Sequence, residues 1–274
     1  MQPAQEAGER SDRSRNIVRG LGSLTAQSAL SAVLGFVLFF SLVRFLPQSL
    51  YGTYAAVQVT VGIAGTFAGF GLSLAVVRHL APGSSGQSGE GWGEAKAALL
   101  LVVALSGAAS AALVGLAPYL SVYFSKSPSS AWVFELGGLW LFTISLASPM
   151  QSLLQGMRRY GILAKVLLVS RLIAVAVAVA GVALYQSLAV AVVSQGLYGA
   201  LIVISILPLV LGPLRKADPR PHFRTVTRYA FPLGLAGIVS MIAGSADIVV
   251  VGGRVSAEGL PLHRRLPGRP VQAG

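Results

Sequence analysis

The sequence predicts an all-α fold, a polytopic membrane helix bundle with about seven transmembrane helices. Of its 274 residues, 54% are hydrophobic and only 11% are charged, whereas a soluble domain carries roughly 25% charged residues. The mean hydropathy of +0.71 points the same way. The apolar residues form stretches of 24 residues or more, and a helix needs about 20 residues to cross a bilayer. The predicted spans are 21–46, 53–80, 97–124, 131–155, 162–185, 188–211 and 226–251.

These stretches are expected to be helices and not strands of a barrel. A transmembrane strand has about 10 residues of alternating polarity, whereas here apolar residues fall on every face of each stretch. Small residues are frequent, as the 32 glycines show, and they allow helices to approach closely in lipid. Pro118, Pro149 and Pro208 lie within spans or near their ends, where neighbouring helices can satisfy the carbonyls that a kink frees.

The connections between spans alternate in charge. Those at 47–52, at 125–130 and around Gln186 carry one basic residue, Lys126. The N-terminus and the other connections are basic, and basic loops stay on the cytoplasmic side. Their basic residues are Arg10, Arg13, Arg15, Arg19, Arg78, Lys96, Arg158, Arg159, Lys165, Arg215, Lys216, Arg220, Arg224 and Arg228. We therefore expect a multi-pass protein of the inner (cytoplasmic) membrane with a cytoplasmic N-terminus. The basic cytoplasmic connections then account for most of the formal charge of +12, and this charge does not indicate nucleic-acid binding.

The spans and loops divide the chain into five expected parts. These are a cytoplasmic tail at 1–20, a six-helix lobe at 21–212, a basic loop at 213–228, a seventh helix at 229–252 and a disordered tail at 253–274. Pro213 and Pro219 are expected to end the sixth helix, because proline interrupts a helix. The tail departs from the charge pattern, since Arg264 and Arg265 fall on the predicted outer side.

Enzyme chemistry finds little support in the sequence. The chain has no cysteine and three histidines, which removes thiolate nucleophiles and cysteine-ligated metal sites. The histidines are His79, His222 and His263, and their spacing matches no metal-binding pair. The Gly-x-x-x-x-Gly-Lys-Ser/Thr loop that cradles phosphates is absent from the sequence. We expect a protein that is not an enzyme and has neither a cofactor nor a metal site.

Short motifs follow one another in order between residues 15 and 258. They are Arg15-Asn16-Ile17-Val18-Arg19-Gly20, Arg44-Phe45-Leu46-Pro47, Tyr51-Gly52-Thr53-Tyr54, Gly69-Phe70-Gly71-Leu72, Arg78-His79-Leu80, Gln155-Gly156, Arg158-Arg159-Tyr160, Tyr229-Ala230-Phe231-Pro232-Leu233 and Ala246-Asp247-Ile248-Val249-Val250. In order and spacing they resemble the Wzx-type polysaccharide-biosynthesis flippases. These flippases are members of the multidrug/oligosaccharidyl-lipid/polysaccharide (MOP) exporter superfamily.

The resemblance implies a transporter that flips a lipid-linked oligosaccharide across the cytoplasmic membrane by alternating access, driven by Na⁺ or H⁺ or by the substrate gradient. Members have two lobes around a central cavity, so this chain would supply one six-helix lobe plus the first helix of the second. It would then be truncated after the seventh helix. A one-nucleotide shift near residue 260 permits a continuation similar to the family, so we hypothesise a frameshift there.

Charged residues inside spans are the candidate site residues, because a charge at mid-bilayer costs about 2.5–3.5 kcal/mol on insertion scales. Arg171 lies within the fifth span and is a candidate for binding a pyrophosphate or an acidic sugar, since arginine pairs bidentately with phosphate oxygens. Arg44 and Arg78 are weaker substrate-binding candidates, because side chains near span ends can reach the interface. Glu135 and Asp247 are candidates for ion coupling or for pairing with a basic residue.

Two other functions remain open from the sequence. A cation-coupled multidrug exporter of the same superfamily would use acidic residues in its cavity, whereas the spans of this chain hold more arginine than acid. A non-transporting scaffold or an inactive fragment is the other alternative, and truncation would favour it. The identity of the sugar, of the lipid carrier and of the coupling ion does not follow from the sequence.

Overall fold

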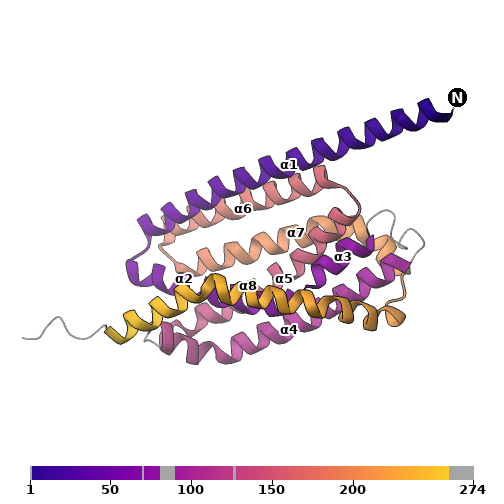
Figure 1. Cartoon of the computed structure of the whole chain (residues 1–274). Helices are drawn as coiled ribbons and strands as arrows, with labels where there is room; N and C mark the ends of the chain where they lie inside the picture. Colours follow the sequence, from indigo (N-terminus) through magenta and orange to yellow (C-terminus); the bar gives the residue numbers. More distant parts are fainter. Residues whose placement is uncertain (1, 70, 81–89, 126–127, 259–274) are drawn as a thin grey trace, which may run out of the picture.

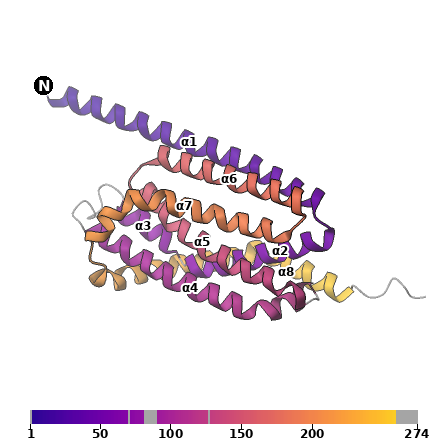
Figure 2. The same cartoon turned by 180° about the vertical axis from the view of Figure 1, so that it is seen from behind.

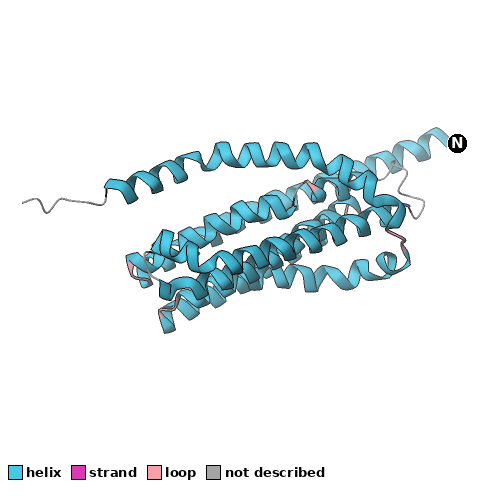
Figure 3. Cartoon of the chain, turned by 90° about the horizontal axis from the view of Figure 1, so that it is seen from below, coloured by secondary structure: helices cyan, strands magenta, loops and turns pink. Residues whose placement is uncertain are grey.

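The chain folds as a bundle of long helices in its computed structural model (Figure 1). The structure describes residues 2–69, 71–80, 90–125 and 128–258, with side chains for 22–69, 71–78, 80, 91–124 and 129–240. In order, the described elements are α1 (Gln2–Phe45), α2 (Gln48–Gly69), α3 (Leu72–Leu80), α4 (Glu90–Ser125), η2 (Pro128–Ser130), α5 (Ala131–Gly156), α6 (Tyr160–Tyr185), α7 (Leu188–Lys216), η3 (Arg220–His222) and α8 (Phe223–Glu258). The described residues contain no strand (Figure 3), so the all-α class is confirmed.

Five described helices are long and apolar enough to cross a membrane. They cover Gly22–Phe45, Gly91–Phe124, Ala131–Gly156, Tyr160–Tyr185 and Leu188–Lys216. A sixth span results if the bent pair α2 and α3 counts as one. The predicted multi-pass membrane protein is therefore confirmed, and six of the predicted spans correspond to these helices. The seventh lies in α8, whose side chains are described only to residue 240, and it stays a prediction.

The helices pack in an order different from their order in the sequence. α1 lies along α6, and α5 packs between α4 and α7 (Figure 1, Figure 2). α8 lies against α2, α3 and α4. Because successive spans run in opposite directions, all strongly basic connections lie at one end of the bundle, which we call the basic end. It is the end where α3, α5 and α7 finish and α4, α6 and α8 begin.

At the basic end, the start of α4 contacts the link from α7 to α8. Lys96 Nζ donates a hydrogen bond of 2.8 Å to the Ala217 carbonyl oxygen. His222 Nδ1 lies 3.8 Å from Glu94 Oε1. These contacts hold the link between α7 and α8 close to the start of α4.

Several helix boundaries differ from the expected ones. α1 begins at Gln2, so the segment expected as a cytoplasmic tail at 1–20 is helical and continuous with the first span. α7 continues through Pro213 to Lys216, and α8 begins at Phe223, so the basic stretch 213–228 is mostly helical. A proline near a helix end is tolerated in membrane helices because neighbouring groups satisfy the carbonyl that it frees. α8 continues to Glu258, and the expected tail beyond it lies outside the described residues.

The second predicted span is broken where α2 gives way to α3, at an angle of 47°. Gly71 follows the break with a φ of +71°, which an L side chain adopts only with strain. A Cβ there would lie 2.8 Å from Leu233 Cβ and 2.9 Å from the Ala230 carbonyl oxygen of α8. Glycine therefore allows both the bend and the close approach of α8 at this point.

The apolar core consists of two clusters, one toward each end of the bundle. The cluster at the basic end includes Leu163 and Leu167 of α6 and Ile202 and Ile206 of α7. The cluster at the opposite end includes Val175, Ala178 and Val182 of α6 together with Ala191 and Val192 of α7. α6 and α7 thus pass from one cluster into the other near their middles.

Replacing Gln186 with glycine is expected to stabilise the turn between α6 and α7. Gln186 ends α6 with a φ of 47° and donates its backbone N–H to the Val182 carbonyl oxygen. The left-handed conformation costs an L residue roughly 1–2 kcal/mol and costs glycine little. Thermal unfolding in detergent should show a higher melting temperature for Gln186→Gly. A lower melting temperature would contradict this account of the turn.

Candidate functional site

A layer of polar side chains separates the two apolar clusters. It consists of Ser145 of α5, Arg171 of α6, and Gln195 and Tyr198 of α7, which we call the polar layer. On α5, Trp140 and Leu141 belong to one cluster and Ala147 and Met150 to the other. Ser145 lies between these two pairs. Arg171 and Gln195 occupy the same changeover on α6 and α7, so the layer crosses the bundle at about mid-height.

Arg171 is the centre of this layer. The side chain is partly buried, and its Nη1 donates a hydrogen bond of 3.1 Å to Gln195 Oε1. The guanidinium carbon lies 5.3 Å from the centre of the Tyr198 ring, within the range of a cation–π interaction. A Cβ on Gly35 of α1 would lie 3.6 Å from Arg171 Nη2, so the guanidinium group extends between α1 and α7.

The two side chains that interact with Arg171, Gln195 and Tyr198, are both neutral. The described residues include no carboxylate within salt-bridge distance of it. A guanidinium group has five N–H donors, and a single hydrogen bond from the group is observed here. Among the described residues, the guanidinium group therefore has no neutralising carboxylate and has donors that could bind an anion.

Two further polar groups of the layer have no hydrogen-bond partner. Ser145 Oγ and Gln195 Nε2 are buried, and neither is satisfied among the described residues. A buried polar atom without a partner costs about 1–3 kcal/mol. Gln195 accepts from Arg171 with its oxygen and leaves its amide N–H groups free, so it adds donors beside the guanidinium group.

An aromatic wall adjoins the polar layer on the side away from the basic end. Tyr54 of α2 stacks on Trp140 of α5, with the ring centres 6.5 Å apart and the planes tilted by 13°. α7 packs against this wall at Gly196, where a Cβ would lie 3.5 Å from Trp140 Cα, an ordinary van der Waals distance. The rings of Tyr54 and Trp140 thus form the apolar boundary of the site on the side away from the basic end.

The comparisons with known proteins place the chain in a family. It matches the family described as polysaccharide biosynthesis protein over residues 17–260. The chain belongs to this family. Neither the curated proteins nor the solved structures include a match. The resemblance found in the sequence motifs is thus confirmed at the level of the polysaccharide biosynthesis family.

The other predicted site residues whose side chains the structure describes, Arg44, Arg78 and Glu135, do not join Arg171. Arg44 is exposed in the last turn of α1, at the end opposite the basic end. Arg78 is exposed near the end of α3, with its guanidinium carbon 4.6 Å from the centre of the Tyr229 ring. Glu135 is exposed near the start of α5. Asp247 lies in α8 beyond the described side chains.

Sequence reasoning missed the neutral partners of Arg171. Gln195, Tyr198 and Ser145 carry no charge, and a search for charged residues within spans passes over them. A search for all amide side chains within the predicted spans would have included Gln195, because polar residues inside a membrane span are rare and often functional. Tyr198 follows Gln195 by three residues, the spacing that places both on one helix face.

Proposed function

We propose that this member of the polysaccharide biosynthesis family is a transporter that flips a lipid-linked oligosaccharide, and is not an enzyme. Alternating access would move the saccharide across the cytoplasmic membrane, with the N-terminus on the cytoplasmic side. The location of the basic connections at one end of the bundle supports that orientation, because basic loops stay in the cytoplasm. Na⁺ or H⁺ would supply the energy, or the gradient of the substrate itself.

The observation that carries the proposal is the cation at mid-height of the bundle, which has no carboxylate partner among the described residues. A charged residue within a membrane span marks a functional site by default. Arg171 has neutral partners and free donors beside the buried Gln195 amide. An anion with several oxygens, such as the diphosphate that links a lipid to a saccharide, fits this donor set.

The test is a flipping assay with the full chain in proteoliposomes. Three fluorescent substrates are compared: a lipid diphosphate saccharide, a neutral glycolipid and a cationic amphiphile. Accessibility of the label to a membrane-impermeant quencher reports transbilayer movement. We expect movement of the diphosphate saccharide well above that in empty liposomes, and little movement of the other two substrates.

Each other outcome favours a different function. Preference for the cationic amphiphile would support the multidrug-exporter alternative and contradict the proposal. Movement of none of the substrates by a chain that is folded, as judged by circular dichroism and a cooperative melt, would favour a scaffold or an inactive fragment.

A further inference from the structure

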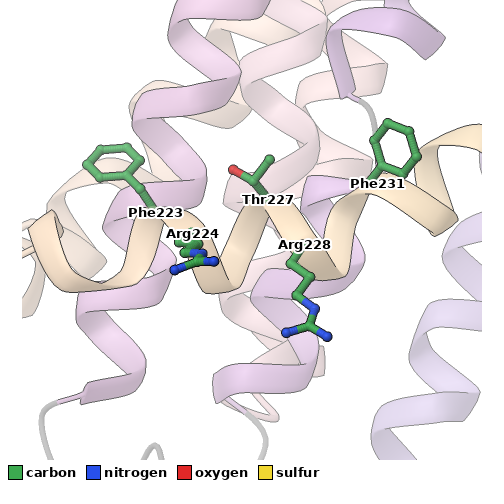
Figure 4. Close-up of a pocket in the computed structure, with 5 residues that line it drawn as sticks. All are labelled: Phe223, Arg224, Thr227, Arg228 and Phe231. Atoms are coloured by element: carbon green, nitrogen blue, oxygen red, sulfur yellow. The ribbon is translucent and has the colours of Figure 1, made fainter.

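The first turns of α8 carry a groove at the basic end that no part of the proposed transport site uses. The groove has a volume of about 670 Å³. Its lining residues are Phe223, Arg224, Thr227, Arg228 and Phe231 (Figure 4). A second groove of about 650 Å³ adjoins it and is lined by Arg224, Thr225, Arg228, Tyr229 and Pro232. Arg224 and Arg228 therefore line both.

The two arginines form an unneutralised pair of cations. Both are exposed, and they point to the same side of α8 (Figure 4). They lie four residues apart, a spacing at which like charges on a helix repel. Neither forms an ion pair with any described residue. An anion bound between them would remove the repulsion.

A third arginine reaches the same region from another helix. Arg78 of α3 lies over the ring of Tyr229, which lines the second groove. Arg78 is exposed, so its donors remain accessible while its face contacts the ring. Cations from α3 and α8 thus gather around one aromatic residue.

An apolar stripe on α8 begins at the groove and runs toward the middle of the bundle. Phe231, Leu235 and Val239 follow one another at four-residue spacing and are 59%, 53% and 60% exposed. Residues at this spacing lie on one helix face. The chain therefore presents cations at the basic end and, directly beyond them, an apolar face about two helix turns long.

We propose that the grooves around Arg224 and Arg228 bind the phosphate headgroup of an anionic membrane phospholipid. The acyl chains would lie along Phe231, Leu235 and Val239. Basic residues at the membrane surface attract anionic lipids, and arginine binds phosphate oxygens bidentately. A free phosphate would use the cations alone and would leave the stripe without a role, which is why we assign a lipid. The inference is independent of the transported substrate.

The test counts lipids retained by the purified full chain. The protein is equilibrated in detergent with equal amounts of phosphatidylglycerol and phosphatidylcholine, and native mass spectrometry measures which lipid stays bound. We expect preferential retention of phosphatidylglycerol. The double variant Arg224→Gln/Arg228→Gln should lose this preference, by on the order of tenfold for each arginine, because each removes a charge-assisted hydrogen bond.

The matched control is Arg158→Gln/Arg159→Gln, which removes two exposed arginines from another connection at the same end. It should keep the preference, since a discrete site depends on position and not on total charge. Leu235→Asn should weaken retention of long-chain phosphatidylglycerol more than that of a short-chain analogue.

Four results would overturn the proposal. The first is unchanged retention of phosphatidylglycerol by the Arg224/Arg228 double variant, and the second is an equal loss of retention in the Arg158/Arg159 control variant. The third is displacement of the bound lipid by inorganic phosphate. The fourth is a change in the oligomeric state of the Arg224/Arg228 variant without a change in the amount of bound lipid. The first two would point to diffuse surface attraction. The third would indicate a site for free phosphate, and the fourth would indicate contact with a second copy of the chain.

Discussion

Replacing Arg171 with glutamine is expected to slow flipping of a lipid diphosphate saccharide by about tenfold to a hundredfold. A hydrogen bond to a charged group contributes about 1.5–3 kcal/mol, and the loss of one such bond to the substrate would reduce the rate by this factor. Glutamine retains a polar side chain beside Gln195 and Tyr198 but removes the charge. Initial flipping rates in proteoliposomes, measured at equal protein density, check the prediction.

Three controls separate a binding role of Arg171 from a structural one. Arg171 has neutral partners, so its removal leaves no buried charge unpaired, and the melting temperature of Arg171→Gln should stay close to that of the unchanged protein. Arg215→Gln makes the same chemical change at an exposed position in the last turn of α7 and should flip normally. Arg171→Lys keeps the charge without the planar fork and should be intermediate. An unaltered rate in Arg171→Gln would exclude Arg171 from the transport site.

Replacing Gly199 with alanine is expected to destabilise the bundle by about 1–3 kcal/mol, the range for an overpacked core. Its added Cβ would lie 2.7 Å from the Thr143 carbonyl carbon, 2.8 Å from Ile144 N and 2.9 Å from the Thr143 carbonyl oxygen. These are backbone atoms, so α7 must move away from α5. Gly199 also lies next to Tyr198, so the movement would disturb the polar layer. The melting temperature in detergent measures the loss.

Replacing Gly107 of α4 with alanine is expected to have the opposite effect on stability. A Cβ at Gly107 of α4 would meet no atom within 4 Å, and alanine is better than glycine within a helix by about 0.8–1.0 kcal/mol. Gly107→Ala should therefore raise the melting temperature, or leave it unchanged, while Gly199→Ala lowers it. Equal effects of the two substitutions would show that helix propensity, and not the α5–α7 contact, decides the outcome.

The spans were predictable because the bilayer fixes their length and composition. A helix that crosses lipid needs a long apolar stretch, and such a stretch is visible without any knowledge of its neighbours. The break near Gly71 was not visible, because the apolar stretch 53–80 continues through it. At the break Gly71 lies against α8, which comes from far along the chain, and this contact cannot be read from the local sequence.

Arg171 was predictable for a similar reason, since a charge within a span stands out against apolar neighbours. Its surroundings were not, because they come from helices that meet only in three dimensions. Gln195 and Tyr198 belong to α7, Gly35 to α1, and Tyr54 to α2. The continuation of α7 through Pro213 was also missed, because proline was taken as the end of the helix without regard to its position in the last turn.

The central claim is that Arg171 is a binding site for the anionic linkage of a lipid-linked saccharide. Equilibrium binding of a lipid diphosphate saccharide to the purified chain, with and without Arg171→Gln, tests it most directly. We predict a loss of affinity of about tenfold or more in the variant, with no change in the weak binding of a neutral glycolipid of the same chain length. Equal affinity of both proteins for the diphosphate ligand would contradict the claim.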